Sequence, residues 1–119
     1  MADANLILKQ TLNVTCMRND TFSLAMVWKD SNDVLIDLTA YTFIAEVKKN
    51  TSDLTNFLSF SDSDFTKDAS GNLTMNKTSA EMDLVPGFYY FDIQATKISD
   101  STVQTWAGGN FIIKQDVTD

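Results

Sequence analysis

The regular alternation of side chains over residues 21–29 (TFSLAMVWK) constrains the fold of this chain more than any other feature. One face of this segment carries four large apolar residues, Phe22, Leu24, Met26 and Trp28, and the other face is mostly small or polar. A period of two over nine residues is typical of a β-strand with one buried face. We therefore predict a strand whose apolar side chains lie in the core of a β-sheet protein.

The same period recurs along the rest of the chain. Residues 5–17 and 41–48 each place apolar side chains on one face, and shorter strands are expected near residues 56–60 and 73–77. The chain closes with strands over residues 88–95 and 103–114. On these two strands the expected core residues are Tyr89, Phe91, Ile93, Phe111 and Ile113. The Gly108-Gly109 pair inside the last strand indicates a bulge or bend rather than a hairpin turn.

Two local signals precede the strand at residues 88–95. Thr78 and Glu81 have the spacing of a capping box, which predicts one or two helical turns. Pro86 would end them, and Pro86-Gly87 is the pattern of a type II turn, in which glycine tolerates a positive φ. The placement of Tyr89 after this turn resembles the tyrosine corner of immunoglobulin-like domains. Val85 stands where that motif often has Asp, and Phe91 stands where antibody domains carry Cys.

These elements together predict an all-β fold, an immunoglobulin-like β-sandwich of about seven strands with one short helical crossover. The chain has 119 residues, which is the usual size of one domain, so residues 1–119 are expected to form a single sandwich. Residues 1–8 are interpreted as a docking arm and residues 115–119 as a tail.

The charge of the chain disfavours two classes of binding partner, nucleic acids and membranes. The formal charge of −7 disfavours nucleic acid, because phosphate binding requires clustered Lys and Arg. The chain also lacks a basic amphipathic segment, so no membrane partner is expected. Cys16 is the only cysteine, which excludes an intrachain disulfide, and it is expected to fill space in the core. With no recognisable leader at the N-terminus, synthesis in the cytoplasm is expected.

No group of residues in the sequence indicates a catalytic site. There is no histidine, the commonest general base and metal ligand near neutral pH. Asp62, Asp64 and Asp68 are close in sequence, but Lys67 and Leu73 occupy the positions where an EF-hand needs Gly and Glu. We interpret this segment, and the one containing Asp30, Asp33 and Asp37, as solvated acidic loops. No catalytic residue, metal site or cofactor is predicted, and an enzyme is not expected.

Three blocks of sequence carry a resemblance to a known family. Asp20-Thr21-Phe22 opens a strand that ends in Trp28-Lys29-Asp30, Ile36 to Thr39 leads to Tyr41, and Pro86-Gly87 precedes Tyr90-Phe91-Asp92. With the closing segment from Gly109 to Thr118, this order resembles the immunoglobulin-like domain of tailed-phage virion proteins. It is similar to the N-terminal domain of phage baseplate upper proteins and to related head or tail accessory proteins. The resemblance covers nearly the whole chain and implies a structural, non-enzymatic role in a virion.

We therefore expect an accessory protein that docks on other virion proteins in multiple copies, with a capsid auxiliary (decoration) protein favoured. A tail, collar or baseplate component is the alternative, as is a carbohydrate- or receptor-binding module. The expected partner-binding residues are apolar positions of the arm and of the irregular loop after residue 54: Leu6, Ile7, Leu8, Phe57, Leu58 and Phe60. A terminal strand readily adds to a partner's sheet, whereas the loop residues could instead cap the open end of the sandwich.

Overall fold

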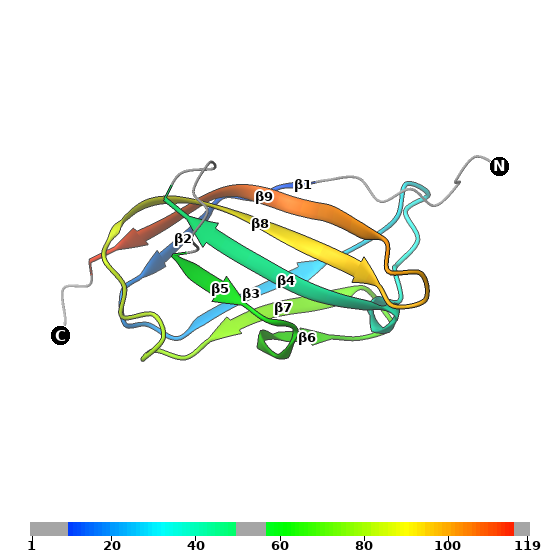
Figure 1. Ribbon diagram of the computed structural model, residues 1–119, viewed down its shortest axis with the longest axis horizontal. Helices are drawn as coiled ribbons and strands as arrows, with labels where there is room; N and C mark the ends of the chain where they lie inside the picture. The colour runs from blue at the N-terminus through cyan, green and yellow to red at the C-terminus, as the bar shows by residue number, and fades with distance from the viewer. Residues whose placement is uncertain (1–9, 50–56, 116–119) are drawn as a thin grey trace.

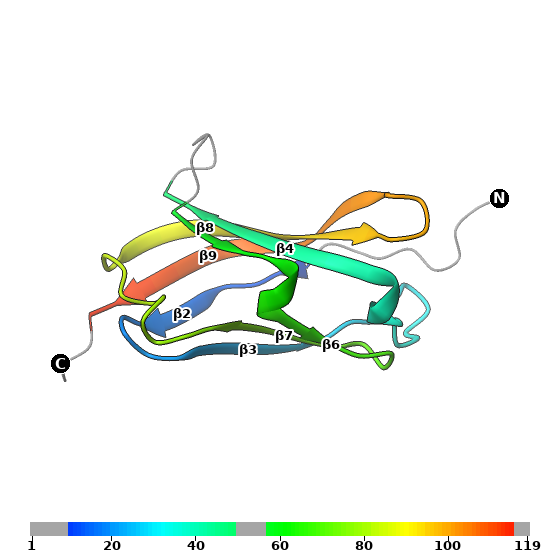
Figure 2. The same ribbon diagram turned by 60° about the horizontal axis from the view of Figure 1, so that its bottom comes forward.

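Two facing β-sheets make up the part of the chain that the structure, a computed structural model, describes: residues 10–49 and 57–115 (Figures 1 and 2). Its elements in chain order are β1 (Gln10–Thr11), β2 (Val14–Met17), β3 (Phe22–Val27), η1 (Leu38–Ala40), β4 (Tyr41–Lys48), β5 (Leu58–Phe60), η2 (Asp62–Asp64), β6 (Phe65–Lys67), β7 (Asn72–Lys77), β8 (Gly87–Lys97) and β9 (Val103–Lys114). Both η elements are single turns of 3-10 helix, which the sequence patterns did not indicate.

The order of the strands is that of an immunoglobulin-like sandwich, which confirms the predicted fold class. The larger sheet runs β5-β4-β8-β9, with β1 and β2 both paired to β9, and the smaller sheet runs β3-β7-β6. The immunoglobulin plan places strands C, F and G in one sheet and B, E and D in the other. The first set corresponds to β4, β8 and β9, and the second to β3, β7 and β6. The N-terminal strand differs from the constant-type plan, because it pairs with β9 and not with β3.

The single strand expected over residues 5–17 lies partly outside the described residues, and its described part is interrupted. Both β1 and β2 run parallel to β9 in one continuous register, Gln10 opposite Ala107 and Val14 opposite Phe111. Between them Asn13 turns its side-chain oxygen to the amide of Asn110 (3.2 Å). There the Leu12 carbonyl oxygen approaches Gly109 so closely that a Cβ on Gly109 would meet it at 1.9 Å. Gly109 is therefore required by the approach of a neighbouring backbone.

The expected bulge in the last strand exists, but it lies at Trp106 and not at the glycines. Ile93 pairs with Ala107 while the next residue, Gln94, pairs with Thr105, so β9 carries one extra residue. This bulge lets the consecutive residues Trp106 and Ala107 both turn inward, at 1% and 0% exposure. An alternating pattern cannot place two neighbours on one face, so the sequence expectation omitted Trp106 from the core.

Trp106 is the centre of an aromatic cluster that joins the two sheets. Its ring centroid lies 5.3 Å from that of Trp28, at the end of β3, and 4.9 and 5.3 Å from those of Tyr41 and Phe43 on β4. Of the nine residues expected in the core, seven are buried: Phe22, Trp28, Tyr89, Phe91, Ile93, Phe111 and Ile113. The other two, Leu24 and Met26, are half-buried and pack against the core, because β3 lies at the edge of its sheet.

The segment before β8 forms the tyrosine corner but not the predicted turn. The Tyr89 hydroxyl donates to the carbonyl oxygen of Val85 at 2.7 Å, which is the defining bond of that motif. Gly87 is the first residue of β8 and does not have a positive φ, so the type II turn was wrong. Its Cα lies instead under the Tyr89 ring, which a Cβ would meet at 3.4 Å.

The helical crossover before Pro86 was also wrong in extent. Thr78 and Glu81 do form the capping box: the Glu81 amide donates to the Thr78 hydroxyl and the Thr78 amide donates to the Glu81 carboxylate, both at 3.2 Å. The chain closes one turn, with the Met82 amide bonded to the Thr78 carbonyl at 3.1 Å, and no helix follows. Met82 is fully buried and ends the turn by entering the core.

Replacing Gly109 by Ala should destabilise the protein, because the new methyl group cannot coexist with the Leu12 carbonyl at its present position. Overpacking of this kind costs about 1–3 kcal/mol, which reversible urea unfolding would measure. The matched control is Gly87→Ala, where the nearest atoms lie at ordinary contact distance. Equal stability of the two variants would contradict the close approach of the Leu12 backbone to β9.

Candidate interaction surface

The residues that were expected to bind a partner differ in their burial, and three of them are not described by the structure. Leu6, Ile7 and Leu8 lie outside the described residues. Phe60 was a wrong choice: it is 1% exposed and packs against Phe22 at a ring-centroid distance of 5.8 Å.

Phe57 and Leu58 are half-buried, and Phe57 stacks on Tyr89 with ring centroids 4.1 Å apart. These two side chains cover one end of the core. The loop hydrophobes therefore follow the capping alternative, because β5 pairs with β4 in a register that turns Phe60 inward, opposite Ala45.

A different surface presents apolar side chains to solvent: the outer face of the larger sheet. Phe88 is 76% exposed, Tyr90 45% and Ile44 42%. Phe88 and Tyr90 are neighbours on one face of β8, with Phe88 opposite Ile112 on β9 and Tyr90 opposite Lys48 on β4. Ile44 lies on the same face farther along the sheet, opposite Gln94. Phe88 and Tyr90 alternate with the buried residues Tyr89 and Phe91, so both rings lie on the outer side of β8. No described element covers them (Figure 1).

A shallow pocket of about 110 Å³ lies beside Tyr90 on this outer face. Its lining comes from two neighbouring strands: Glu46 and Lys48 of β4, and Tyr90, Phe91 and Asp92 of β8. Glu46 and Asp92 are directly opposite each other in the β4–β8 register. The outer face thus combines exposed rings with two carboxylates and one ammonium group, and this mixture suits contact with another macromolecule or a stacked polar ligand.

The three aspartates considered for a metal bind groups of the protein itself. Asp62 accepts from the amide of Phe43 at 2.9 Å and from the Lys67 ammonium group at 3.2 Å. Asp68 accepts from the side-chain amide of Asn72 at 2.8 Å and from the backbone amides of Asn72 and Ser70 at 3.0 and 2.8 Å, and these bonds hold the pKa of Asp68 below its usual range. Within residues 10–49 and 57–115, no three His, Cys, Asp or Glu side chains form a group that could hold a metal ion.

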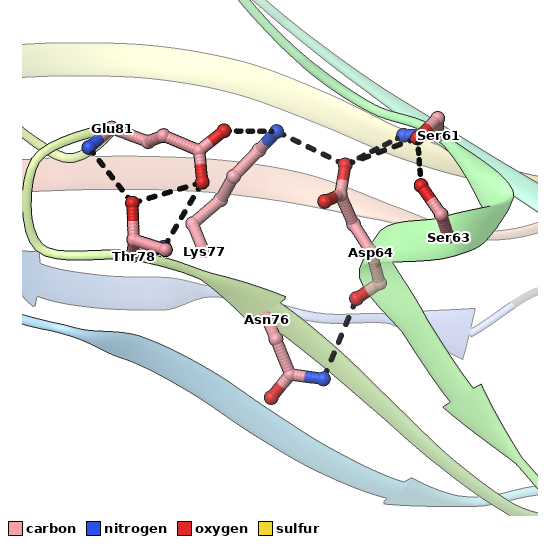
Figure 3. Close-up of polar contacts among 7 residues, drawn as sticks. All are labelled: Ser61, Ser63, Asp64, Asn76, Lys77, Thr78 and Glu81. Carbon is pink, nitrogen blue, oxygen red and sulfur yellow. Dashed lines mark hydrogen bonds and ion pairs between the residues drawn. The ribbon is translucent and has the colours of Figure 1, made fainter.

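Asp64 belongs to the one ionic cluster with a buried charge among the described residues (Figure 3). The side chain of Lys77, at the end of β7, is 7% exposed and its ammonium group lies 3.0 Å from Asp64 and 3.4 Å from Glu81. Asp64 caps η2 by accepting from the Ser61 amide at 2.9 Å, and Glu81 closes the capping box with Thr78. Lys77 therefore joins two capped turns that are distant in sequence.

These bonds lower the pKa values of both Asp64 and Glu81. Burial works to raise the pKa of Asp64, but hydrogen bonds from the Ser61 amide and from Lys77 outweigh it and hold that pKa below its usual range. The Thr78 amide and hydroxyl do the same for the pKa of Glu81, with a smaller contribution from Lys77. The cluster stabilises the fold, and each of its charged groups is engaged by another.

Cys16 is a half-buried thiol on β2 whose Sγ lies 3.7 Å from the carbonyl oxygen of Ile112. Burial, together with the nearby charge of Asp20, raises the pKa of Cys16 to about 11. The thiol is therefore protonated at neutral pH, which suits a space-filling residue and not a nucleophile.

In the described part of the chain no helix is long and apolar enough to cross a membrane.

Lys77→Met should lower stability by about 1–3 kcal/mol at neutral pH, because it leaves Asp64 and Glu81 without their shared cation. Lys29→Met, which breaks the exposed pair with Asp33, is the matched control and should change stability by less than about 1 kcal/mol. Urea unfolding of the two variants makes the comparison.

The same cluster predicts that the folded protein loses stability at acidic pH. Because the pKa values of Asp64 and Glu81 are lowered from 3.8 and 4.5, the unfolded chain binds more protons than the folded one in that range. Their contribution is complete above about pH 4.5 and is lost as the pH falls through the lowered values. Lys77→Met should make this loss smaller below about pH 4.5, and an unchanged dependence of stability on pH there would contradict the role given to Lys77.

Comparisons with known proteins do not assign this chain to a family. No protein-family model and no curated protein sequence matches the chain. Among solved structures the chain is similar to the NK cell receptor Nkp44, described as a triggering partner in natural cytotoxicity, at 16% identity and a TM-score of 0.43. The similarity covers 89% of this chain and 98% of that one. The chain's own strand order and its tyrosine corner make it an immunoglobulin-like β-sandwich.

Proposed function

We propose that this chain is a non-enzymatic structural protein of a tailed-phage virion, an accessory module that docks on other virion proteins. The observation that carries the proposal is the outer face of the larger sheet, where Phe88, Tyr90 and Ile44 are 76%, 45% and 42% exposed. A position on the capsid as an auxiliary (decoration) protein is favoured over one on the tail, collar or baseplate. The resemblance of the sequence to virion domains supports the particle setting.

The chemistry of this face supports docking on protein. Exposed aromatic residues that lie together on a regular surface are typical of interfaces, where Tyr, Trp and Phe carry much of the binding energy. Phe88 lies opposite Ile112 across the β8–β9 ladder, so the ring has an apolar neighbour on a rigid sheet. The formal charge of −7 favours a position away from packaged DNA, on the outside of a particle.

One observation favours a second candidate function, a carbohydrate- or receptor-binding module. Tyr90 borders the pocket that Glu46 and Asp92 also line. A tyrosine ring beside carboxylates can stack on a sugar while the acids accept from its hydroxyl groups. A glycan array separates the two functions: a glycan bound by the wild-type chain and lost in Tyr90→Ala would favour the second.

The virion proposal is tested with Phe88→Ser in the phage that encodes the chain. The expected result is that the wild-type chain is found in purified particles by mass spectrometry and that the variant is depleted at least about tenfold, as loss of an aromatic interface residue predicts. Val34→Ser is the control, since Val34 is 56% exposed and lies in the loop between β3 and η1, outside the larger sheet.

Two outcomes would contradict different parts of the proposal. Particles that lack the wild-type chain would overturn the virion setting. Equal incorporation of Phe88→Ser and Val34→Ser would leave the setting intact and show that the outer face of the larger sheet around Phe88 is not the docking surface.

A further inference from the structure

The smaller sheet has an open edge along β3. In the described residues β3 pairs only with β7, in a register that sets Phe22 opposite Lys77 and Val27 opposite Asn72. The amide of Trp28 continues this ladder by donating to the Gly71 carbonyl at 2.8 Å. In an antiparallel pair, alternate residues turn their backbone groups to opposite sides. The N–H and C=O groups of Ser23, Ala25 and Val27 therefore face away from β7, along the open edge.

This edge lacks the features that usually protect a terminal strand. Natural sheets shorten their edge strands or interrupt them with charge, proline or a bulge. The other described edges follow that rule: β5 and β6 have three residues each, and β1 and β2 are separated at Leu12 and Asn13. By contrast, β3 has six residues, FSLAMV, with no charge, proline or glycine. An uninterrupted, uncharged edge is a ready template for another strand.

A pocket of about 370 Å³ lies beside the end of this strand. It lies between β1 and the end of β3, and it is lined by Gln10, Leu12, Met26, Val27, Trp28, Lys29 and Asp30. Trp28 is 4% exposed, and its indole N–H has no acceptor among the described residues. A strand added to β3 would cover this pocket, could place an apolar side chain in it, and would bring carbonyl oxygens to the same wall.

The direction of the chain indicates whether the strand added to β3 comes from the same chain or from a second copy. Gln10 and Asp30 border the same pocket, whereas Met17 is joined to Phe22 by a short turn, with the Asp20 amide bonded to the Met17 carbonyl at 3.3 Å. The path from β1 to β2 is therefore antiparallel to β3. Residues 1–9 precede Gln10, so lying along β3 of their own chain would require a reversal immediately before β1. Reaching β3 of a second copy requires none.

We propose that residues 1–9 of one copy bind the open β3 edge of a second copy by β-strand addition. Nine extended residues span up to about 30 Å, and the six residues of β3 span about 20 Å, so the segment is long enough. Its sequence includes Leu6-Ile7-Leu8, an uncharged apolar run that matches an uncharged edge. This self-association does not depend on the virion setting, since both partners are the same chain.

The test uses full-length chains and sedimentation velocity over a concentration series. The wild-type chain should form dimers or larger assemblies. Ala25→Pro should weaken association at least about tenfold, because it removes an outward N–H and leaves the bonds to β7 in place. Ala25→Val keeps that N–H and is the control. Val27→Lys, at a position that is 60% exposed, should weaken association in the same way without relying on proline.

A mixing experiment then identifies the two halves of the contact. Leu6→Asp/Leu8→Asp disables the arm and keeps the edge, whereas Ala25→Pro disables the edge and keeps the arm. Each variant alone should be monomeric, and an equimolar mixture should give mixed dimers by native mass spectrometry.

Three results would overturn the proposal: a monomeric wild-type chain, equal association of Ala25→Pro and Ala25→Val, or no mixed dimers. Association that survives Leu6→Asp/Leu8→Asp but not Ala25→Pro would also overturn it, in favour of direct pairing of β3 with β3 of the second copy.

Discussion

The contact of Trp106 with Trp28 is the interaction on which the sandwich depends. Trp28 belongs to the smaller sheet and Trp106 to the larger one, and their rings meet inside the core at 5.3 Å. The contact exists because β9 carries an extra residue at Trp106, which turns two consecutive side chains inward. The same ring touches Tyr41 and Phe43, so one bulge aligns β4, β9 and the end of β3. Without it, the indole of Trp106 would face solvent.

Alternation in the sequence was sufficient to predict the strands and most of the core. The apolar face of residues 21–29 is the buried face of β3, and the alternation at Tyr89, Phe91 and Ile93 is that of β8. Alternation could not predict the role of a residue that depends on contact with a residue far away in the sequence. Gly109 is explained only by the Leu12 carbonyl.

The candidate interaction surface was harder to predict for the same reason. Phe60 and Phe88 are both aromatic residues near turns, yet one is 1% and the other 76% exposed. The difference lies in which side of a sheet each faces, and therefore in pairing register: Phe60 lies opposite Ala45, on the inner face, and Phe88 lies opposite Ile112, on the outer one. A shift of one residue in either strand would exchange their roles. Local sequence does not determine that register.

The proposed docking face and the open edge belong to different sheets. Phe88 and Tyr90 lie on the outside of the larger sheet, whereas β3 borders the smaller one (Figure 2). Occupation of one surface leaves the other accessible. A chain with two such independent contacts can link to its own kind through one and to a different protein through the other, which is the minimum requirement for a continuous layer on a larger assembly.

The parallel pairing of β1 and β2 with β9 also has a mechanical consequence. Gln10 lies at one end of this ladder, opposite Ala107, and Met17 lies at the other end, opposite Lys114. Tension applied to Gln10 and Lys114 in opposite directions acts along both strands and so loads every hydrogen bond between them in shear. Bonds loaded together resist force better than bonds opened one by one. A domain built in this way suits a position where its two ends are pulled apart.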